Sequence, residues 1–348
     1  MPCYSPIKGY RARYRNKSGK RPIVFKVDEG YDDQPVTVAC GRCMGCRLEY
    51  SRQWAIRCVH EAQMHDENCF ITLTYAPEHL PPDHSIRKEE VQKFMKRLRK
   101  AAKVRLRYFA CGEYGTKNNR PHYHAIIFGY SFPDRKLWTI KNGNRLYRSE
   151  LLESVWTKGH SSIGECTFES AAYVARYVTK KYTKPEPSER SDARQERSEE
   201  KINMKYTVVD DTTGEIFTLE PEFALMSRRP GIGRSWLEKY RNDTNKDFIT
   251  IRGAKMSLPK YYDQIIEEME ERDELIREEV GTAYPERQEP EMWLRKQRRI
   301  SKVDKADNTI DRLRVKENVK LAQFKMLHRG LENEVEDIHN LRPRRKGI

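Results

Sequence analysis

Two histidines separated by one residue, His122 and His124, open an apolar stretch that continues to Phe128. Alternate side chains of a β-strand project from one face, so both imidazoles would point to the same side. The two imidazoles could then bind one metal ion. Glu113 would reach that ion if its segment paired with the histidine strand as a hairpin. This donor set leaves coordination positions open and suits Mn²⁺ or Mg²⁺ acting on a phosphate. The competing interpretation is two ordinary strand histidines, because His-x-His alone is a weak signal.

A pair of tyrosines, Tyr173 and Tyr177, forms a second chemical pattern. Their spacing places both on one face of a predicted helix, and Lys180 and Lys181 continue that face by one turn. A tyrosine oxygen can attack a phosphodiester and conserve the bond as phosphotyrosine. A lysine or a metal would ease ionisation of the phenol, whose ordinary pKa is about 10. The alternative is a tyrosine pair packed in the core.

A third pattern consists of Cys40, Cys43 and Cys46, spaced C-x₂-C-x₂-C. Such spacing can bind structural Zn²⁺, with Cys3 or His60 as the fourth ligand. Plain thiols are the alternative, because three cysteines are an incomplete set. The other cysteines stand in apolar contexts and are predicted to be core residues: Cys58, Cys69, Cys111 and Cys166.

The charge of the chain indicates a polyanionic partner. The 348 residues include 67 Lys and Arg against 52 Asp and Glu, a formal net charge of +15. Such an excess is typical of nucleic-acid-binding proteins. Arg11 and Arg13 beside tyrosines could neutralise single-stranded DNA, and Arg228 and Arg229 precede a glycine-rich turn suited to phosphate. We expect no membrane span and no signal peptide, because no long apolar run occurs.

The sequence predicts that the elements that position these residues form an α+β unit. The predicted order is β-α-β-β-α-β followed by a helix, which favours an antiparallel sheet with helices on one face. The predicted segments are strand 70–75, helix 91–98, strand 105–111, strand 122–128, helix 151–156, strand 163–168 and helix 169–182.

Composition divides the chain further. A basic segment with the cysteines and a helix at about 47–65 fills 1–66, and the α/β unit fills 67–183. Charged residues without apolar period predict a mobile insertion at 184–203. A hairpin turning near Asp211–Gly214 and the Arg/Gly loop within 204–258 would complete the core. The remainder, 259–348, is predicted to be charged and helical.

Three ordered segments together resemble the motifs of HUH endonucleases, the rolling-circle replication initiators. They are Phe70–Tyr75, Pro121–His124 and Tyr173–Lys181. The two-tyrosine form is similar to initiators of the Microviridae, especially the gokushovirus branch, whose likeness extends over about residues 1–250. The resemblance implies a ferredoxin-like core with a central His-x-His strand.

The resemblance also implies roles and partners. His122, His124 and Glu113 would hold Mg²⁺ or Mn²⁺, Tyr173 and Tyr177 would be nucleophiles, and Lys180 or Lys181 would support the transition state. The substrate would be single-stranded DNA at a phage origin, in the cytoplasm of a bacterial host. Because no G-x₄-G-K-[ST] motif occurs, we expect the helicase, like the polymerase, to come from the host. A relaxase or transposase of the same chemistry and a non-catalytic DNA-binding protein remain alternatives.

Overall fold

The structure is a computed structural model, and it describes most of the chain in segments. The described residues are 3–16, 19, 21–115, 120–141, 143–180, 206–209, 214–244, 248–280 and 309–326. Within them, the side chains of 176–180, 208–209, 217, 274–280 and 324–326 lie outside the description. Two compact units result, one within Met1–Tyr50 and Lys296–Leu327 and one within Ser51–Arg295.

The first unit contains a small antiparallel sheet. Its strands are ordered β2-β1-β3, with β1 at Ile7–Ala12, β2 at Ile23–Val24 and β3 at Gly30–Val38. A Cβ added at Gly30 would lie 2.5 Å from the Cβ of Tyr10, so the close approach of β1 and β3 requires glycine there. The unit also holds α9 (Ile310–Met326) and the first turns of α1 (Met44–Ala62).

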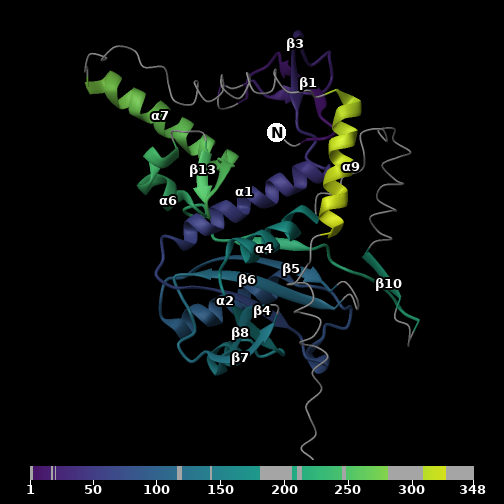
Figure 1. Cartoon of the computed structure of the whole chain (residues 1–348), viewed down its shortest axis with the longest axis vertical. Helices are drawn as coiled ribbons and strands as arrows, with labels where there is room; N and C mark the ends of the chain where they lie inside the picture. The colour runs from purple at the N-terminus through teal and green to yellow at the C-terminus, as the bar shows by residue number, and fades with distance from the viewer. Residues whose placement is uncertain are drawn as a thin grey trace, which may run out of the picture. The chain divides into compact units, whose positions relative to one another are not determined.

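The second unit is built on a seven-stranded sheet ordered β12-β5-β6-β4-β9-β8-β7 (Figure 1). Every pairing in it is antiparallel, as predicted for an α+β fold. The hairpin β7–β8 was not predicted, because its apolar residues are interrupted by exposed charged ones. The strands are β4 Asn68–Thr74, β5 Arg107–Tyr114, β6 Pro121–Phe128, β7 Lys136–Lys141, β8 Asn144–Arg148, β9 Ser161–Gly164 and β12 Phe223–Met226.

Helices cover both faces of this sheet, so the expectation of helices on one face was wrong. On one face, α2 (Lys88–Ala102) and α3 (Glu150–Val155) pack against odd-numbered residues of β4 and β6. On the other, α1 and α4 (Phe168–Lys180) pack against even-numbered residues of the same strands. The physical reason is visible in β6, which is buried along its whole length and therefore needs cover on both sides.

The remaining described elements lie outside these two sheets. Strands β10 (Thr207–Val209) and β11 (Ile216–Thr218) pair antiparallel, which confirms the predicted hairpin, although its turn at 210–213 lies outside the described residues. The others are η1 Pro77–His79, α6 Arg234–Lys239, η3 Arg241–Thr244, β13 Phe248–Ile251, β14 Ala254–Ser257 and α7 Lys260–Val280.

Helices α7 and α9 agree with a helical region after residue 259. The expected insertion at 184–203 and the basic tail lie outside the described residues. Among the described helices, none has both the length and the apolar character needed to cross a membrane.

Candidate metal centre

Strand register brings the predicted metal ligands together. Glu113 of β5 pairs directly with His122 of β6, and His124 of β6 pairs with Thr72 of β4 on its other side. Glu113, His122 and His124 therefore project from the face of the sheet that α1 and α4 cover. The hairpin assumed for Glu113 in the sequence is confirmed by this register.

The three side chains converge on one point in the interior. His122 Nε2 lies 2.9 Å from Glu113 Oε1, and His124 Nε2 lies 2.8 Å from the same oxygen. Exposed fractions are 1% for Glu113, 2% for His122 and 1% for His124. Ligand atoms this close and this well shielded from water form a group that could hold a metal ion.

Hydrogen bonds to the far side of each imidazole fix its orientation. His122 Nδ1 donates to the carbonyl oxygen of Arg120 at 3.0 Å, and His124 Nδ1 lies 3.0 Å from Thr72 Oγ1. A carbonyl only accepts, so the proton of a neutral His122 is on Nδ1 and its Nε2 lone pair faces the Glu113 carboxylate. Opposed lone pairs repel unless a proton or a cation lies between them.

A cation fits this donor set for a second reason. Among the described side chains, none forms a hydrogen bond with the buried Glu113 Oε2, which is costly for a carboxylate oxygen unless another group engages it. The hydrogen bonds that the outer nitrogens of these histidines make with the Arg120 carbonyl and the Thr72 hydroxyl are of the kind that orient metal-binding histidines. The residues present therefore suit a divalent metal with mixed nitrogen and oxygen ligands.

The neighbouring histidines favour the ionised form of the Glu113 carboxylate, and burial favours the neutral form of the His124 imidazole. Burial alone would raise the pKa of Glu113, but the adjacent His122 and His124 outweigh it and hold this pKa at about 2. Burial lowers the pKa of His124, with Glu113 opposing the shift. At neutral pH both groups are thus in the protonation states that metal binding requires.

Helix α4 adds Tyr173 to the same point. The Tyr173 hydroxyl donates to Glu113 Oε1 at 2.9 Å, and its ring meets the His124 ring edge-on at a centroid distance of 5.0 Å. Tyr173 is 1% exposed. Tyr177 follows one turn later in α4, but its side chain and that of Lys180 lie outside the described residues, as does Lys181 entirely.

Two contributors to this site were not found in the sequence. Thr72 and the carbonyl of Arg120 act only through the far nitrogens of the histidines. Thr72 lies in a strand that the sequence predicted correctly. Its relation to His124 depends on the pairing of β4 with β6, for which the chain carries no local signal.

The predicted DNA-binding arginines are exposed in both units. Arg228 and Arg229 follow β12, and Arg11 and Arg13 lie in or just after β1. The loop after Arg229 is pinned from α1, because Arg57 Nε donates to the carbonyl of Ile232 at 3.0 Å. The other anchors of this loop are Gly233 N–H to Glu61 Oε2 at 2.7 Å and Arg107 Nη2 to Pro230 O at 2.7 Å.

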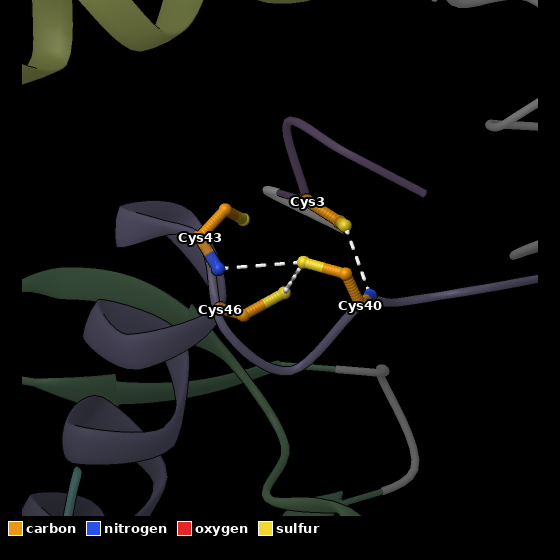
Figure 2. Close-up of side chains that lie close together, drawn as sticks. All are labelled: Cys3, Cys40, Cys43 and Cys46. Carbon is orange, nitrogen blue, oxygen red and sulfur yellow. Dashed lines mark hydrogen bonds between the residues drawn. The ribbon is translucent and has the colours of Figure 1, made fainter. Parts of the chain in front are cut away.

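The cysteine pattern is also brought together, in the first unit. Cys3, Cys40, Cys43 and Cys46 place their sulfur atoms within 4.8 Å of one another (Figure 2). His60, the alternative fourth ligand, instead bonds Tyr262 Oη through Nδ1 at 2.9 Å. The remaining cysteines are core residues as predicted, with Cys166 only partly covered: Cys58, Cys69, Cys111 and Cys166.

Comparisons with known proteins show that the chain is similar to replication-associated proteins of phages. Residues 68–182 match the family model described as replication-associated protein ORF2/G2P. The chain is 32% identical over 234 residues to replication-associated protein VP4 of Bdellovibrio phage phiMH2K, covering 64% of this chain and 65% of that protein. It is 35% identical over 197 residues to replication-associated protein ORF2 of Spiroplasma virus 4, covering 52% of this chain and 61% of that protein.

A further relative is replication-associated protein ORF4 of Chlamydia phage 1, 32% identical over 152 residues. That match covers 41% of this chain and 38% of the relative. The chain thus spans less than two thirds of the length of each of these three relatives. No solved structure matches the chain with statistical significance.

Proposed function

Because residues 68–182 match the family model of replication-associated protein ORF2/G2P, we propose that this chain nicks and rejoins single-stranded DNA. It would start and end rolling-circle replication of a small phage genome through phosphotyrosine intermediates. The observation that carries the proposal is the hydrogen bond from Tyr173 to Glu113, beside His122 and His124. It joins a candidate nucleophile to a candidate metal ligand in one buried group.

The proposed cleavage exchanges one phosphate ester for another. The phenol oxygen of one tyrosine attacks a backbone phosphorus atom, and the bond from phosphorus to the 3′ oxygen breaks. The phenol loses its proton, the departing 3′ oxygen gains one, and the 5′ phosphate stays on the tyrosine. After one round, the second tyrosine cuts the regenerated origin. The new 3′ hydroxyl then attacks the first phosphotyrosine and loses its proton, the bond from phosphorus to the tyrosine oxygen breaks, and the released phenol regains a proton as the strand closes into a circle.

The chain's own residues would prepare this reaction. Thr72 and the Arg120 carbonyl hold the imidazoles of His122 and His124 in fixed orientations. Mg²⁺ or Mn²⁺ held by these histidines and Glu113 would act as a Lewis acid on a phosphate oxygen. Since Tyr173 is 1% exposed, the DNA must displace part of the cover over this tyrosine before it can react.

Substrate and partners follow from charge and from the relatives. Exposed Arg228, Arg229, Arg11 and Arg13 would neutralise phosphates of the single strand. Lys180 or Lys181 would stabilise charge that develops on the phosphate during attack. We place the reaction at a phage origin in the cytoplasm of a bacterial host, with helicase and polymerase supplied by that host.

The test is a search for a covalent protein–DNA adduct. The purified chain is mixed with Mn²⁺ and single-stranded oligonucleotides that tile the genome encoding it, and a denaturing gel shows whether an adduct survives boiling. Tyr173→Phe, Tyr177→Phe and the double variant run beside the natural chain. We expect the adduct to disappear in the double variant, because no phenol oxygen remains at either position.

The matched control is Tyr240→Phe, which removes a phenol oxygen from a tyrosine outside the central sheet. It should leave the adduct unchanged. Tight DNA binding without an adduct in Mn²⁺ or Mg²⁺ would contradict the enzyme and favour a non-catalytic DNA-binding protein. An adduct formed only with conjugative or transposon-end DNA would favour a relaxase or a transposase.

A further inference from the structure

The four clustered cysteines have the spacing of a tetrahedral metal site. Their sulfur atoms lie within 4.8 Å of one another, and Cys40 Sγ and Cys46 Sγ are 3.9 Å apart. Four sulfurs around Zn²⁺, each at about 2.3 Å, stand ~3.8 Å from one another. Figure 2 shows Cys3 gathered at this point with Cys40 and Cys43, which precede α1, and with Cys46 in the first turn of α1.

Backbone N–H groups point at these sulfurs as they do at thiolates. The amides of Arg42 and Cys43 donate to Cys40 Sγ at 3.4 and 3.3 Å. Cys40 N–H donates to Cys3 Sγ at 3.3 Å, and Tyr4 N–H donates to Cys43 Sγ at 3.3 Å. Such donors stabilise negative charge on sulfur, and a thiolate is the form that binds metal.

The turn between the first two cysteines of the pattern is built for this arrangement. Gly41 has a φ of +75°, in the left-handed region where a side chain would be strained. This conformation aims two successive amides at Cys40. The four cysteines are all free thiols, so the cluster is held by no disulfide.

Charge near the cluster also fits a metal–thiolate complex. Zn²⁺ with four thiolates carries a net charge of about −2, which a partly buried site must offset. Arg42 and Arg47 adjoin cysteines of the cluster in the chain. Among the described residues, no group forms a hydrogen bond with the buried Arg42 Nη1 or Arg47 Nε, so each side chain keeps a buried nitrogen that could offset this charge.

We propose that Cys3, Cys40, Cys43 and Cys46 bind one structural Zn²⁺. With all four ligand positions filled by sulfur, no position is open for a substrate, so the role is structural. The ion would tie the chain's beginning to the first turn of α1 and close the segment that contains β1, β2 and β3. It would thereby order the small sheet that presents Arg11 and Arg13. The proposal does not depend on DNA cleavage.

The test measures zinc in the full chain, purified without added metal. We expect about one tightly bound zinc per chain, lost in Cys43→Ser and kept in Cys166→Ser, which changes a cysteine outside the cluster. Replacing zinc by Co²⁺ in the natural chain should give the intense visible bands of a tetrahedral thiolate complex. This spectrum keeps the proposal testable even if Cys43→Ser fails to fold.

Several outcomes would overturn the proposal. One is a folded, zinc-free chain in which the cluster cysteines react freely with a thiol reagent under native conditions. Another is zinc that survives Cys43→Ser but is lost in His124→Gln, which would place it on the central sheet. A Co²⁺ spectrum without sulfur charge-transfer bands would exclude the tetrathiolate. Loss of proteolytic protection of residues 3–50 on zinc removal would support the structural role.

Discussion

The central sheet and the N-terminal unit each gather candidate metal ligands, but by different means. On the sheet, Glu113, His122 and His124 are placed by the backbone pairing of β5 with β6. In the N-terminal unit, Cys3 reaches its three partners from a separate segment of chain, and mainly weak N–H···S contacts hold the group. The sheet site would thus be built before a metal arrives, whereas the cysteine cluster would need its proposed ion to hold it together.

The difference shows how each site should respond to damage. Loss of a ligand from the sheet should remove chemistry and leave the fold, because strand pairing and two apolar layers support that site. Loss of a ligand from the cysteine cluster should reduce the stability of the N-terminal unit. The following variants test this contrast, from the largest expected effect to the smallest.

His124→Gln should separate the two sites most clearly. It removes one proposed metal ligand from the sheet and with it several kcal/mol of transition-state stabilisation. We therefore expect the rate of adduct formation to fall about 10³-fold. Zinc content should stay unchanged, since His124 does not belong to the cysteine cluster. Quantified adduct yield and metal analysis of the same sample provide the two readouts. Loss of zinc from this variant would contradict the separation of the sheet site from the cysteine cluster.

Thr72→Val should weaken the sheet site without removing a ligand. It deletes the hydroxyl beside His124 Nδ1, so we expect roughly 10- to 100-fold weaker Mn²⁺ affinity. The measurement is the Mn²⁺ concentration that gives half-maximal adduct formation. Thr74→Val is the matched control on the same strand, because Thr74 Oγ1 donates to the carbonyl of His160 instead. Equal effects of both variants would mean that Thr72 matters only for packing.

Glu113→Gln should change how the metal-free chain responds to acid. The folded pKa of about 2 lies below the ordinary 4.5, so the unfolded carboxyl takes up a proton first. Stability from Glu113 is therefore fully present above pH 4.5 and is lost as the pH falls toward 2. The free energy of unfolding, measured with denaturant across this window, should fall less steeply with decreasing pH in the variant. The difference in slope should be at most about 1.4 kcal/mol per pH unit.

The control for this pH experiment is Glu89→Gln, an exposed glutamate in α2. Its slope should match that of the natural chain. A natural chain whose stability shows no dependence on Glu113 in this window would mean that the carboxyl is not ionised when buried.

Much of the sheet site was predictable because its signals are local. The His-x-His spacing needs only the alternation of a strand, and Glu113 needs only a hairpin between neighbouring segments. The position of Tyr173 beside Glu113 was not predictable, because it depends on α4 packing across the sheet. The same holds for the second helical layer, since α1 belongs in the chain to the cysteine-containing segment.

By itself, the sequence determined the types and order of the strands and the helix around the site and the cationic charge, and it predicted which residues bind a metal or attack a phosphate. These properties depend on neighbouring residues and on composition. Only the tertiary structure decided that Cys3 rather than His60 completes the cysteine cluster and that Thr72 supports His124. Both choices join residues distant in the chain, and strand register and packing settle such contacts only when the whole fold forms.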